Sequence, residues 1–302
     1  METNKINILF IVNPKAGITI KSKLFIRLLA GRYLDSRRYT PEIQFTKYAT
    51  HATELTKEAV EKGITTVIAV GGDGTVNEVA SALVNTNVTL GILPTGSGNG
   101  LAHHLKIPMN LIQALKVINK GKSKPIDTVN INGKLFTSIA GIGFDATVAE
   151  KFASSGVRGL LSYMRIILQE FRTYQSRDYT MLVDGKSYER KALMISFANS
   201  DQFGFHSRIA PQAKIDDGWL DICVVTKPSL SRVLFIAPRV FFGTFGNTGY
   251  AEYFKAKEIK LPNTAGSNVN IDGEAINMKD DISIKVNPLS LKVLVKEVRS
   301  RK

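Results

Sequence analysis

The first part of the chain, up to residue 125, alternates short apolar runs with segments of amphipathic spacing. Apolar runs with the length of buried strands lie at residues 6–12, 67–70 and 89–93. Apolar positions recur with helical spacing at residues 21–34, 52–62, 76–84 and 111–120. Each apolar run ends in a loop rich in glycine and polar residues. This alternation predicts an α/β domain with a parallel sheet.

The pattern changes after the polar segment at residues 121–125, which is a candidate domain boundary. Asn132-Gly133 separates two strand-like runs and is typical of a hairpin turn. Helical spacing interrupts the second half at residues 160–174 and 230–242. Strands are predicted at residues 128–131, 135–140, 179–183, 192–197, 220–225, 257–261, 269–271, 282–286 and 291–295. The second domain is therefore predicted to be all-β and sandwich-like.

The run Gly71-Gly72-Asp73-Gly74-Thr75 lies between a predicted strand and a predicted helix. Glycines in such a loop let backbone N–H groups and the helix N-terminus approach an anion, usually phosphate. The glycine order matches neither the P-loop nor the dinucleotide-binding fingerprint. The acid at position 73 indicates a metal ion, or a hydroxyl that must be oriented. A strand-to-helix turn without a ligand is the alternative.

Two further polar loops follow predicted strands of the same sheet, at residues 13–17 and 95–100. The second of these loops carries three glycines that alternate with Ser97 and Asn99. In parallel sheets, ligands bind at the carboxyl ends of the strands. Three such loops at one edge therefore predict a binding site more strongly than any one of them.

The balance of charges restricts the partners that this chain can have. Its 302 residues include 40 Lys and Arg against 26 Asp and Glu, a net charge of +14. Such a charge suits a nucleotide, a nucleic acid or an acidic membrane surface, and a generally basic soluble surface is the alternative. The sequence has no long Lys/Arg run, so we expect no nucleic-acid partner.

The sequence also bears on the cellular location of the chain. Cys223 is its one cysteine, which excludes an internal disulfide and is consistent with a reducing compartment. No apolar stretch reaches the roughly 18 residues of a membrane span. We therefore expect a cytoplasmic protein that touches the inner membrane face peripherally, if it touches a membrane at all.

Two acidic segments in the second half are candidate chemical groups. Asp216 and Asp217 precede a glycine, and a carboxylate with backbone carbonyls suits a hard cation such as Mg²⁺. Asp272 and Glu274 flank another glycine, and either could accept a proton from a substrate hydroxyl within hydrogen-bonding reach. Solvated turns are the alternative for both segments.

These five motifs, in this order, resemble the diacylglycerol kinase catalytic domain family, and in particular its soluble bacterial lipid kinases. The resemblance spans residues 6–298. It implies ATP-dependent phosphorylation of a lipid hydroxyl, an N-terminal Rossmann-like α/β nucleotide domain, a C-terminal β-sandwich, and an active site in the cleft between them. It also implies that the end of the chain returns to the first domain. The implied domains are residues 1–125 with 288–302, and residues 126–287.

The resemblance assigns a role to each motif of the first domain. Asp73 would lie near the transferred phosphate and organise a catalytic Mg²⁺. The residues that would contact ATP are Asn13, Pro14, Lys15, Ala16, Gly17, Thr46, Gly71, Gly72, Asp73, Gly74, Thr75, Val76, Asn77 and Ser97.

The resemblance likewise assigns the acids of the second domain. Asp217, with the backbone carbonyls of Lys214 and Trp219, would hold a structural Mg²⁺. Asp272 and Glu274 would be catalytic carboxylates, with Glu274 the usual proton acceptor.

Two positions depart from the family pattern. Gly100 stands where the soluble bacterial diacylglycerol kinases usually have an Asp, and Ile18 stands where many have a Lys. The acceptor therefore stays open between diacylglycerol and a related lipid alcohol such as a sphingoid base. The alternatives are an NAD kinase-like enzyme and a catalytically weak regulator that binds nucleotide or lipid.

Two segments mix apolar and basic residues in a way that suits an anionic bilayer, at residues 151–177 and 235–245. Ordinary helix burial is the alternative. We expect a lipid substrate at an anionic membrane surface as the partner, and we leave a homodimer open.

Overall fold

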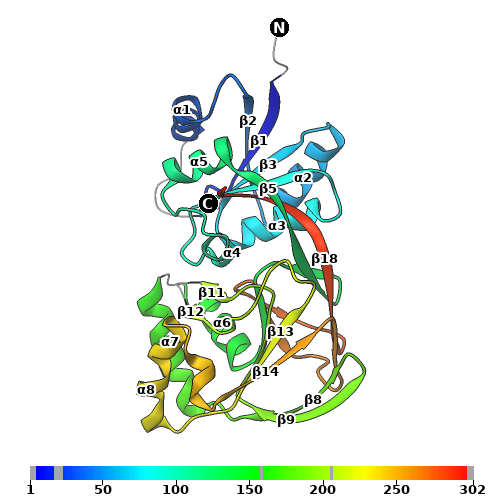
Figure 1. Cartoon of the computed structure of the whole chain (residues 1–302). Coiled ribbons are helices and arrows are strands. Elements are labelled where there is room, and N and C mark those ends of the chain that lie inside the picture. Colours follow the sequence, from blue (N-terminus) through cyan, green and yellow to red (C-terminus); the bar gives the residue numbers. More distant parts are fainter. Residues whose placement is uncertain (1–4, 17–22, 157–158, 205–206, 298–302) are drawn as a thin grey trace, which may run out of the picture. The chain divides into compact units, whose positions relative to one another are not determined.

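A computed structural model of the chain describes residues 5–16, 23–156, 159–204 and 207–297. The chain divides into two compact units. The first unit comprises Met1–Ile126 and Leu289–Lys302, and the second comprises Asp127–Pro288. One ten-stranded sheet contains strands of both units, because the long strand β18 (Ile282–Val295) pairs with strands of each (Figure 1).

The first unit has a parallel sheet with the strand order β2-β1-β3-β4. Its strands are β1 (Ile6–Val12), β2 (Tyr39–Phe45), β3 (Thr66–Gly71) and β4 (Thr89–Pro94). Its helices are α1 (Lys23–Tyr33), α2 (His51–Glu61), α3 (Asp73–Leu83), α4 (Gly100–His104) and α5 (Leu111–Lys120). Phe10, Ile68 and Leu90 are fully buried in the sheet interior. Strands covered on both faces read as continuous apolar runs, which is the pattern of this part of the sequence.

The second unit is an antiparallel β-sandwich. One sheet has the order β14-β13-β10-β7-β16-β17, and the other includes β18-β15-β8-β9 with β5 and β6 at its side. Strands of the first sheet are β7 (Ile139–Gly143), β10 (Met194–Ala198), β13 (Leu220–Val225), β14 (Ala251–Ala256), β16 (Asn268–Ile271) and β17 (Glu274–Asn277). Strands of the second are β5 (Lys122–Ile131), β6 (Lys134–Phe136), β8 (Arg177–Val183), β9 (Lys186–Ala192), β15 (Glu258–Leu261) and β18 (Ile282–Val295). A short hairpin joins β11 (Gln202–Gly204) to β12 (Ser207–Arg208).

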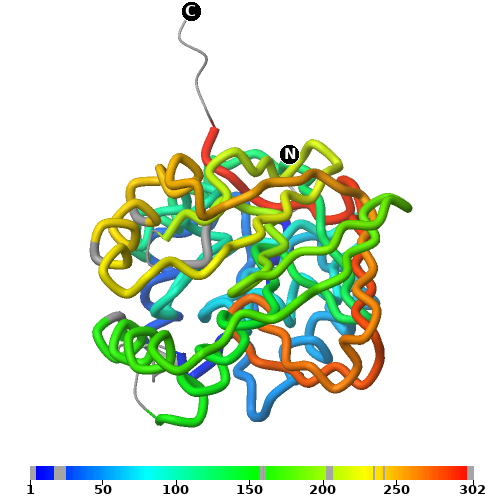
Figure 2. Tube along the Cα trace, turned by 90° about the horizontal axis from the view of Figure 1, so that it is seen from below, coloured from blue at the N-terminus to red at the C-terminus, as the bar shows by residue number. Residues whose placement is uncertain are grey.

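The six-stranded sheet of this sandwich is buried on both faces. Leu220 and Ile222 of β13 face the core between the two sheets, whereas Cys223 and Val225 face a second core on the other side. Three helices cover that other side: α6 (Phe144–Ser154), α7 (Leu160–Thr173) and α8 (Leu230–Phe241). Figure 2 shows the green coil of α7 and the yellow coil of α8 along the same side of the trace. This second core is the setting of the cavity described below.

The structure confirms the fold class and corrects several elements. Helix α3 begins at Asp73, three residues before the expected start, so part of the glycine loop is helical. The strand expected at residues 135–140 is divided between β6 and β7. The two strands expected at 282–286 and 291–295 are one strand, β18, although Leu289 within it has a φ of +49°. Helix α6 was not predicted.

No helix in the described ranges is both long enough and apolar enough to cross a bilayer.

Candidate functional site

The loops after β1, β2, β3 and β4 begin at one edge of the parallel sheet. The strand register pairs Val12 with Val70 and Gly71 with Pro94, so these strands end at the same level. Backbone hydrogen bonds continue the ladder past the last strand residues, from Asn13 N to Val70 O at 3.0 Å and from Thr95 N to Gly71 O at 2.9 Å. Thr46 is held in the same way, because its N–H donates to Val12 O at 2.9 Å. The polar loops found in the sequence are therefore neighbours.

The loop after β1 is tied to the start of α3 by a side-chain hydrogen bond. Asn13 Nδ2 donates to Thr75 Oγ1 at 3.0 Å, and Asn13 Oδ1 accepts from Lys15 N at 2.9 Å. The second bond is an Asx turn, which leaves the Lys15 side chain exposed at the loop. Pro14 and Ala16 are half-buried beside it. Gly17, also expected to contact ATP, and the variant position Ile18 lie outside the described residues.

Glycines in the loops after β3 and β4 allow the backbones of these two loops to touch. A Cβ on Gly96 would lie 2.5 Å from Gly72 Cα, a distance that real Cβ atoms do not adopt. A Cβ on Gly71 would lie 2.4 Å from Thr75 Cβ. The glycines therefore serve close packing of the loops, and they keep the backbone N–H groups at this edge free of side-chain cover.

Asp73 joins the loop after β3 to the loop after β4. Its Oδ2 accepts from Asn99 N and its Oδ1 accepts from Gly100 N, each at 2.7 Å. Both N–H groups belong to the start of α4, so the carboxylate caps that helix and meets its positive end. A Cβ on Gly98 would lie 2.6 Å from Asp73 Oδ2, which is why a glycine stands there. Gly100 stands at the position where the soluble bacterial diacylglycerol kinases usually have an Asp. In this chain its backbone N–H donates to Asp73.

The Thr95 hydroxyl is buried and, in the part of the chain that the structure describes, has no hydrogen-bond partner. An unpaired buried hydroxyl costs free energy, so it is a candidate contact for a bound molecule. Thr95 follows the last residue of β4 directly and its N–H bonds to Gly71. The sequence shows that Thr95 lies in the polar loop after β4, but it does not show that its hydroxyl lacks a hydrogen-bond partner among the described residues.

The other residues expected to contact ATP lie around this edge with different exposures. The Val76 side chain is 6% exposed and packs in the core, and its N–H already donates to Gly72 O at 3.0 Å. Gly74 and Asn77 are half-buried in α3. Ser97 is exposed in the polar loop after β4.

In the second unit, Asp272 is saturated with hydrogen bonds from its own unit. Its Oδ2 accepts from Thr137 N at 2.9 Å and from Thr137 Oγ1 at 3.2 Å. Its Oδ1 accepts from Ser138 N at 2.9 Å and from Ile139 N at 3.1 Å. These bonds fix the turn before β17 to the start of β7. Glu274, two residues on, is the exposed first residue of β17.

The carboxylate expected to hold a structural magnesium ion, Asp217, forms an ion pair with a lysine. Asp217 Oδ2 lies 2.8 Å from Lys255 Nζ, and Asp217 Oδ1 accepts from Trp219 N at 3.1 Å. The hydrogen bond that Lys255 donates to Asp217 raises the pKa of Lys255 above its ordinary value. Lys214, whose carbonyl was expected to join this set, precedes Asp217 in the same turn.

Asp221, on β13, shares the same ammonium. Its Oδ2 is 3.8 Å from Lys255 Nζ, which is an ion pair but too long for a hydrogen bond, and burial raises the pKa of Asp221. Among the described residues there is no group of three or more His, Cys, Asp or Glu side chains arranged for a metal. Asp217 is already paired with Lys255, so the assignment of a magnesium ion to Asp217 with the carbonyls of Lys214 and Trp219 stays a prediction, and no step below depends on it.

Comparison with known proteins gives matches over both units. Residues 7–131 match the model of the diacylglycerol kinase catalytic domain, and residues 138–295 match that of the YegS C-terminal NAD kinase beta sandwich-like domain. The boundary between the two matches falls between β5 and β7, in the segment that contains β6.

Whole-chain relatives agree with these two matches. The chain is 28% identical over 269 residues to a diacylglycerol kinase of Bacillus subtilis, covering 87% of this chain and 88% of that one. It is 31% identical over 232 residues to a "Probable lipid kinase YegS-like" of Klebsiella pneumoniae, covering 75% and 76%. A crystal structure of a diacylglycerol kinase from Bacillus anthracis str. Sterne superposes with a TM-score of 0.72 at 25% identity, covering 97% and 98%. This chain therefore belongs to the family of diacylglycerol kinases and YegS-like lipid kinases.

Proposed function

We propose that this protein is an ATP-dependent kinase that phosphorylates the hydroxyl group of a lipid. The observation that carries the proposal is the junction of three loops at the carboxyl edge of the parallel sheet. Asp73 and the Gly72–Gly96 contact hold these loops together beside the N-terminus of α3. Lipid hydroxyls are the acceptor class because the relatives' names are diacylglycerol kinase and lipid kinase. Diacylglycerol and related lipid alcohols are both candidate acceptors.

The phosphates of ATP would lie along this edge. The start of α3 and the glycine loops offer backbone N–H groups to an anion, and Lys15 adds an exposed positive charge. The buried Thr95 hydroxyl gains a partner if a phosphate oxygen lies against it. Phosphoryl transfer depends mainly on positioning and charge stabilisation, and a magnesium ion would enter with the nucleotide phosphates. Asp73 acts in this account by holding the loops.

Glu274 is the better of the two expected proton acceptors. Both oxygens of Asp272 already accept hydrogen bonds, three of them from backbone N–H groups. Such a carboxylate orders a turn, and taking a proton would require it to give up one of these bonds. Glu274 is exposed on the neighbouring strand, within the same hairpin. A base must reach the substrate hydroxyl, so we assign the proton transfer to Glu274 and the orientation of its turn to Asp272.

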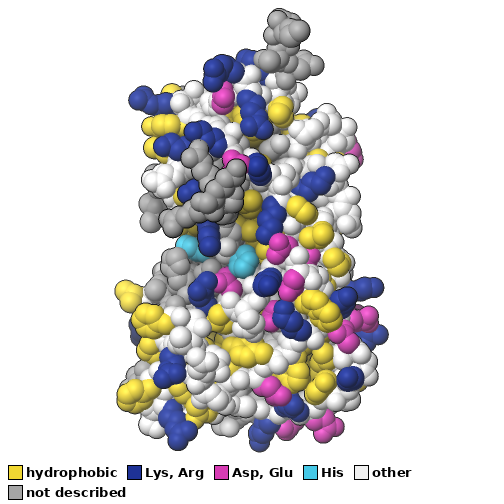
Figure 3. Space-filling view, viewed as in Figure 1, with side chains coloured by type: hydrophobic (Ala, Val, Ile, Leu, Met, Phe, Trp, Pro, Cys, Tyr) yellow, Lys and Arg dark blue, Asp and Glu magenta, His cyan; other side chains and the backbone are white. Residues whose placement is uncertain are grey.

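A membrane contact through α7 and α8 is part of the proposal. The three most exposed large apolar side chains of the described chain are Leu161 at 88%, Phe235 at 78% and Phe242 at 78%. Arg165 and Arg239 are exposed on the same two helices. Apolar side chains that insert and cations that meet anionic headgroups are the two components of interfacial binding. Figure 3 shows yellow and dark-blue side chains mixed over the region where Figure 1 draws α7 and α8.

The deciding experiment is phosphate transfer from radiolabelled ATP. The purified protein is incubated with diacylglycerol, a monoacylglycerol, a sphingoid base or NAD, and the labelled product is identified. We expect a labelled lipid and no labelled NAD. Glu274→Gln should reduce turnover by at least about a hundredfold, the contribution typical of a general base. The matched control is Glu189→Gln, an exposed acid on β9 of the same unit, which should be unchanged.

Two other outcomes would contradict the kinase assignment, and a third would contradict only the assignment of the base. Labelled NAD with no labelled lipid would support the NAD kinase reading. Nucleotide binding without transfer to any acceptor would support a regulator. Normal turnover of Glu274→Gln would remove the proposed base while leaving the kinase assignment in place.

A further inference from the structure

The turn that precedes Glu274 is held by hydrogen bonds at both of its residues. It is the two-residue turn Asp272-Gly273 between β16 and β17, and its φ angles are +47° and +95°. A turn with two positive φ angles costs conformational free energy and persists where its surroundings fix it. The Asp272 carboxylate binds the start of β7, and Gly273 N donates to Asn270 Oδ1 at 2.9 Å.

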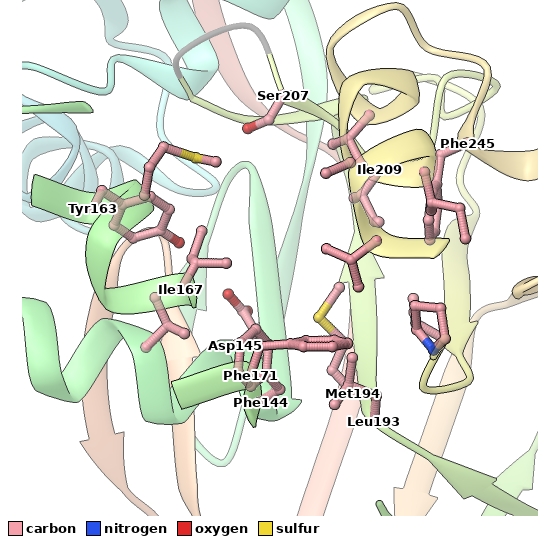
Figure 4. Close-up of a pocket in the computed structure, with 18 residues that line it drawn as sticks. Phe144, Asp145, Tyr163, Ile167, Phe171, Leu193, Met194, Ser207, Ile209 and Phe245 are labelled. Carbon is pink, nitrogen blue, oxygen red and sulfur yellow. The ribbon is translucent and has the colours of Figure 1, made fainter. Parts of the chain in front are cut away.

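The Asn270 side chain is fixed in turn by a carboxylate of helix α6. Asn270 is 3% exposed, and its Nδ2 lies 3.0 Å from each carboxylate oxygen of Asp145. Asp145 is in the first turn of α6 and is buried at the wall of an apolar cavity of about 200 Å³, which lies between α6, α7, α8 and the six-stranded sheet (Figure 4). A buried carboxylate in apolar surroundings is costly for the fold, so its contact with Asn270 needs an explanation.

The carboxylate determines which way the Asn270 amide points. The oxygens of an ionised carboxylate accept hydrogen bonds and cannot donate them, so they select the NH₂ end of the amide. The carbonyl end is then directed at the Gly273 N–H. With the amide turned over, two acceptors would face each other at Asp145 and two donors would face each other at Gly273. Asp145 therefore acts on the turn through Asn270.

The sheet leaves room for this contact. Strand β7 pairs with β16, and Gly141 is the register partner of Asn270. A Cβ on Gly141 would clash with Asp145 Oδ2, so a larger residue on β7 would displace the carboxylate. Two strands and a helix are thus arranged around one contact between a carboxylate and an amide.

We propose that Asn270 is a positioning residue for phosphate transfer, that Asp145 sets the orientation of its amide, and that the two hold the turn from which Glu274 reaches the substrate hydroxyl. The inference rests on the proposed function, in which Glu274 is the base. Glu274 follows Gly273 directly, so the direction of its side chain depends on the backbone of the turn. A catalytic group that is displaced by about 1 Å can lose about a hundredfold in rate.

The first test is a double-mutant cycle on phosphate transfer from radiolabelled ATP to diacylglycerol, or to the sphingoid base if the wild type labels that lipid instead. Asn270→Ala removes both contacts and should lower kcat at least about tenfold, with KM for ATP unchanged. In a Glu274→Gln background the same change should cost less than about twofold, because the base that it positions is already absent. A loss of stability alone would reduce the active enzyme equally in both backgrounds, so equal losses would overturn the inference.

An exchange of the two side chains tests the contact itself. Asn270→Asp alone places a second carboxylate against Asp145 and should lower kcat at least about tenfold. Asp145→Asn combined with Asn270→Asp restores a donor that faces an acceptor, and it keeps a carboxylate oxygen for the Gly273 N–H. The combined variant should therefore recover kcat to within about threefold of the wild type. If it does not recover, the charge at position 145 acts in another way and the inference is overturned.

The matched control is a second carboxylate–amide pair between the same helix and the same strand. Glu150 of α6 is exposed and accepts from Asn268 Nδ2 at 2.9 Å. Asn268 Oδ1 binds Asn277, at the far end of β17 from the turn. Glu150→Gln should therefore leave kcat unchanged. If circular dichroism shows that Asn270→Ala is unfolded, Asn270→Asp takes its place in the cycle.

A measurement that needs no activity separates this inference from the kinase proposal. Solvent exchange of the Gly273 N–H, followed by NMR of protein with isotopically labelled glycine, should be at least about tenfold faster in Asn270→Ala than in the wild type. Faster exchange with normal kcat would keep the kinase and overturn the positioning role. Faster exchange in a protein that phosphorylates no lipid would reject the kinase and retain only the hydrogen bonds. Unchanged exchange would overturn the inference whatever the activity.

Discussion

Single residues at the candidate site act mainly through what they hold in place. Asp73 was expected to face a phosphate and its metal, yet both of its oxygens bind the backbone at the start of α4. Asp272 was expected to be a catalytic carboxylate, a role that stays a prediction, and it holds the start of β7. In both cases the residue type was visible in the sequence, but its partners lie 26 to 135 residues away. A motif therefore marks the site without saying what each member does there.

The Gly72–Gly96 contact predicts the effect of one methyl group. Gly96→Ala places a Cβ 2.5 Å from Gly72 Cα, so the two loops must separate. We expect a loss of about 1–3 kcal/mol in the free energy of unfolding, with weaker ATP binding, by urea denaturation and by nucleotide titration. Gly31→Ala is the control, because nothing lies within 4 Å of its Cβ and the position is helical. That control should gain up to about 1 kcal/mol.

Asp145 predicts how stability depends on pH. Its pKa is about 6 in the folded chain against 3.8 for the ordinary carboxyl, because burial disfavours the charged form. The folded state then binds the proton more tightly, so this contribution to stability is present below pH 4 and is lost as pH rises through 6. Two polar groups lie beside this carboxyl: the amide of Asn270, which is neutral and does not titrate, and the titratable phenol of Tyr163 on α7.

Asp145→Asn removes that titration. The free energy of unfolding of the variant, relative to wild type, should rise by up to about 3 kcal/mol between pH 4 and pH 7. Urea denaturation at both pH values measures it, with Glu150→Gln as the control that shows no such trend. A constant difference between variant and wild type would mean that Asp145 stays charged throughout this range.

At the level of elements, strands and helices were predicted well where the spacing of apolar residues matches the burial of the element. The sequence pattern missed β2 because Pro41 lowers its strand signal, and the structure places β2 at the edge of the sheet, where a proline is tolerated. It missed α6, whose N-cap is Gly143 at a φ of +93° and has no capping side chain. It divided β18 at Pro288, although pairing resumes beyond it with a different neighbour, β4. The first two misses follow from weak local signals, and the third follows from a tertiary partner that local patterns do not contain.

Helices α7 and α8 predict a membrane phenotype. Replacing both Phe235 and Phe242 by Ser removes two side chains that are each 78% exposed, so folding should be unaffected. Vesicle sedimentation should show at least about tenfold weaker binding, because each buried aromatic contributes a few kcal/mol at an interface. Leu28→Ser, at a position on α1 that is 62% exposed, is the control and should bind as wild type. Unchanged binding of the double variant would place the contact elsewhere.

At the level of the whole molecule, charge gives a prediction independent of any single site. The net charge of +14 attracts anionic surfaces over about a Debye length, which salt shortens. Binding to vesicles that contain anionic lipid should weaken at least about tenfold between 50 mM and 500 mM salt, an order-of-magnitude expectation for several screened charges. Neutral vesicles are the control and should show little salt dependence. Equal binding to both kinds of vesicle would leave only the apolar side chains to explain attachment.

The strand β18 has a consequence for how the chain is made. Its first residues pair with β15, and its last residues pair with β4. During synthesis on a ribosome, β1 to β4 emerge about two hundred residues before the end of β18 does. One edge of β4 therefore stays unpaired while the β-sandwich is synthesised. Exposed edges invite pairing with other chains. Nascent chains halted before β18 should therefore be the ones that depend most on chaperones.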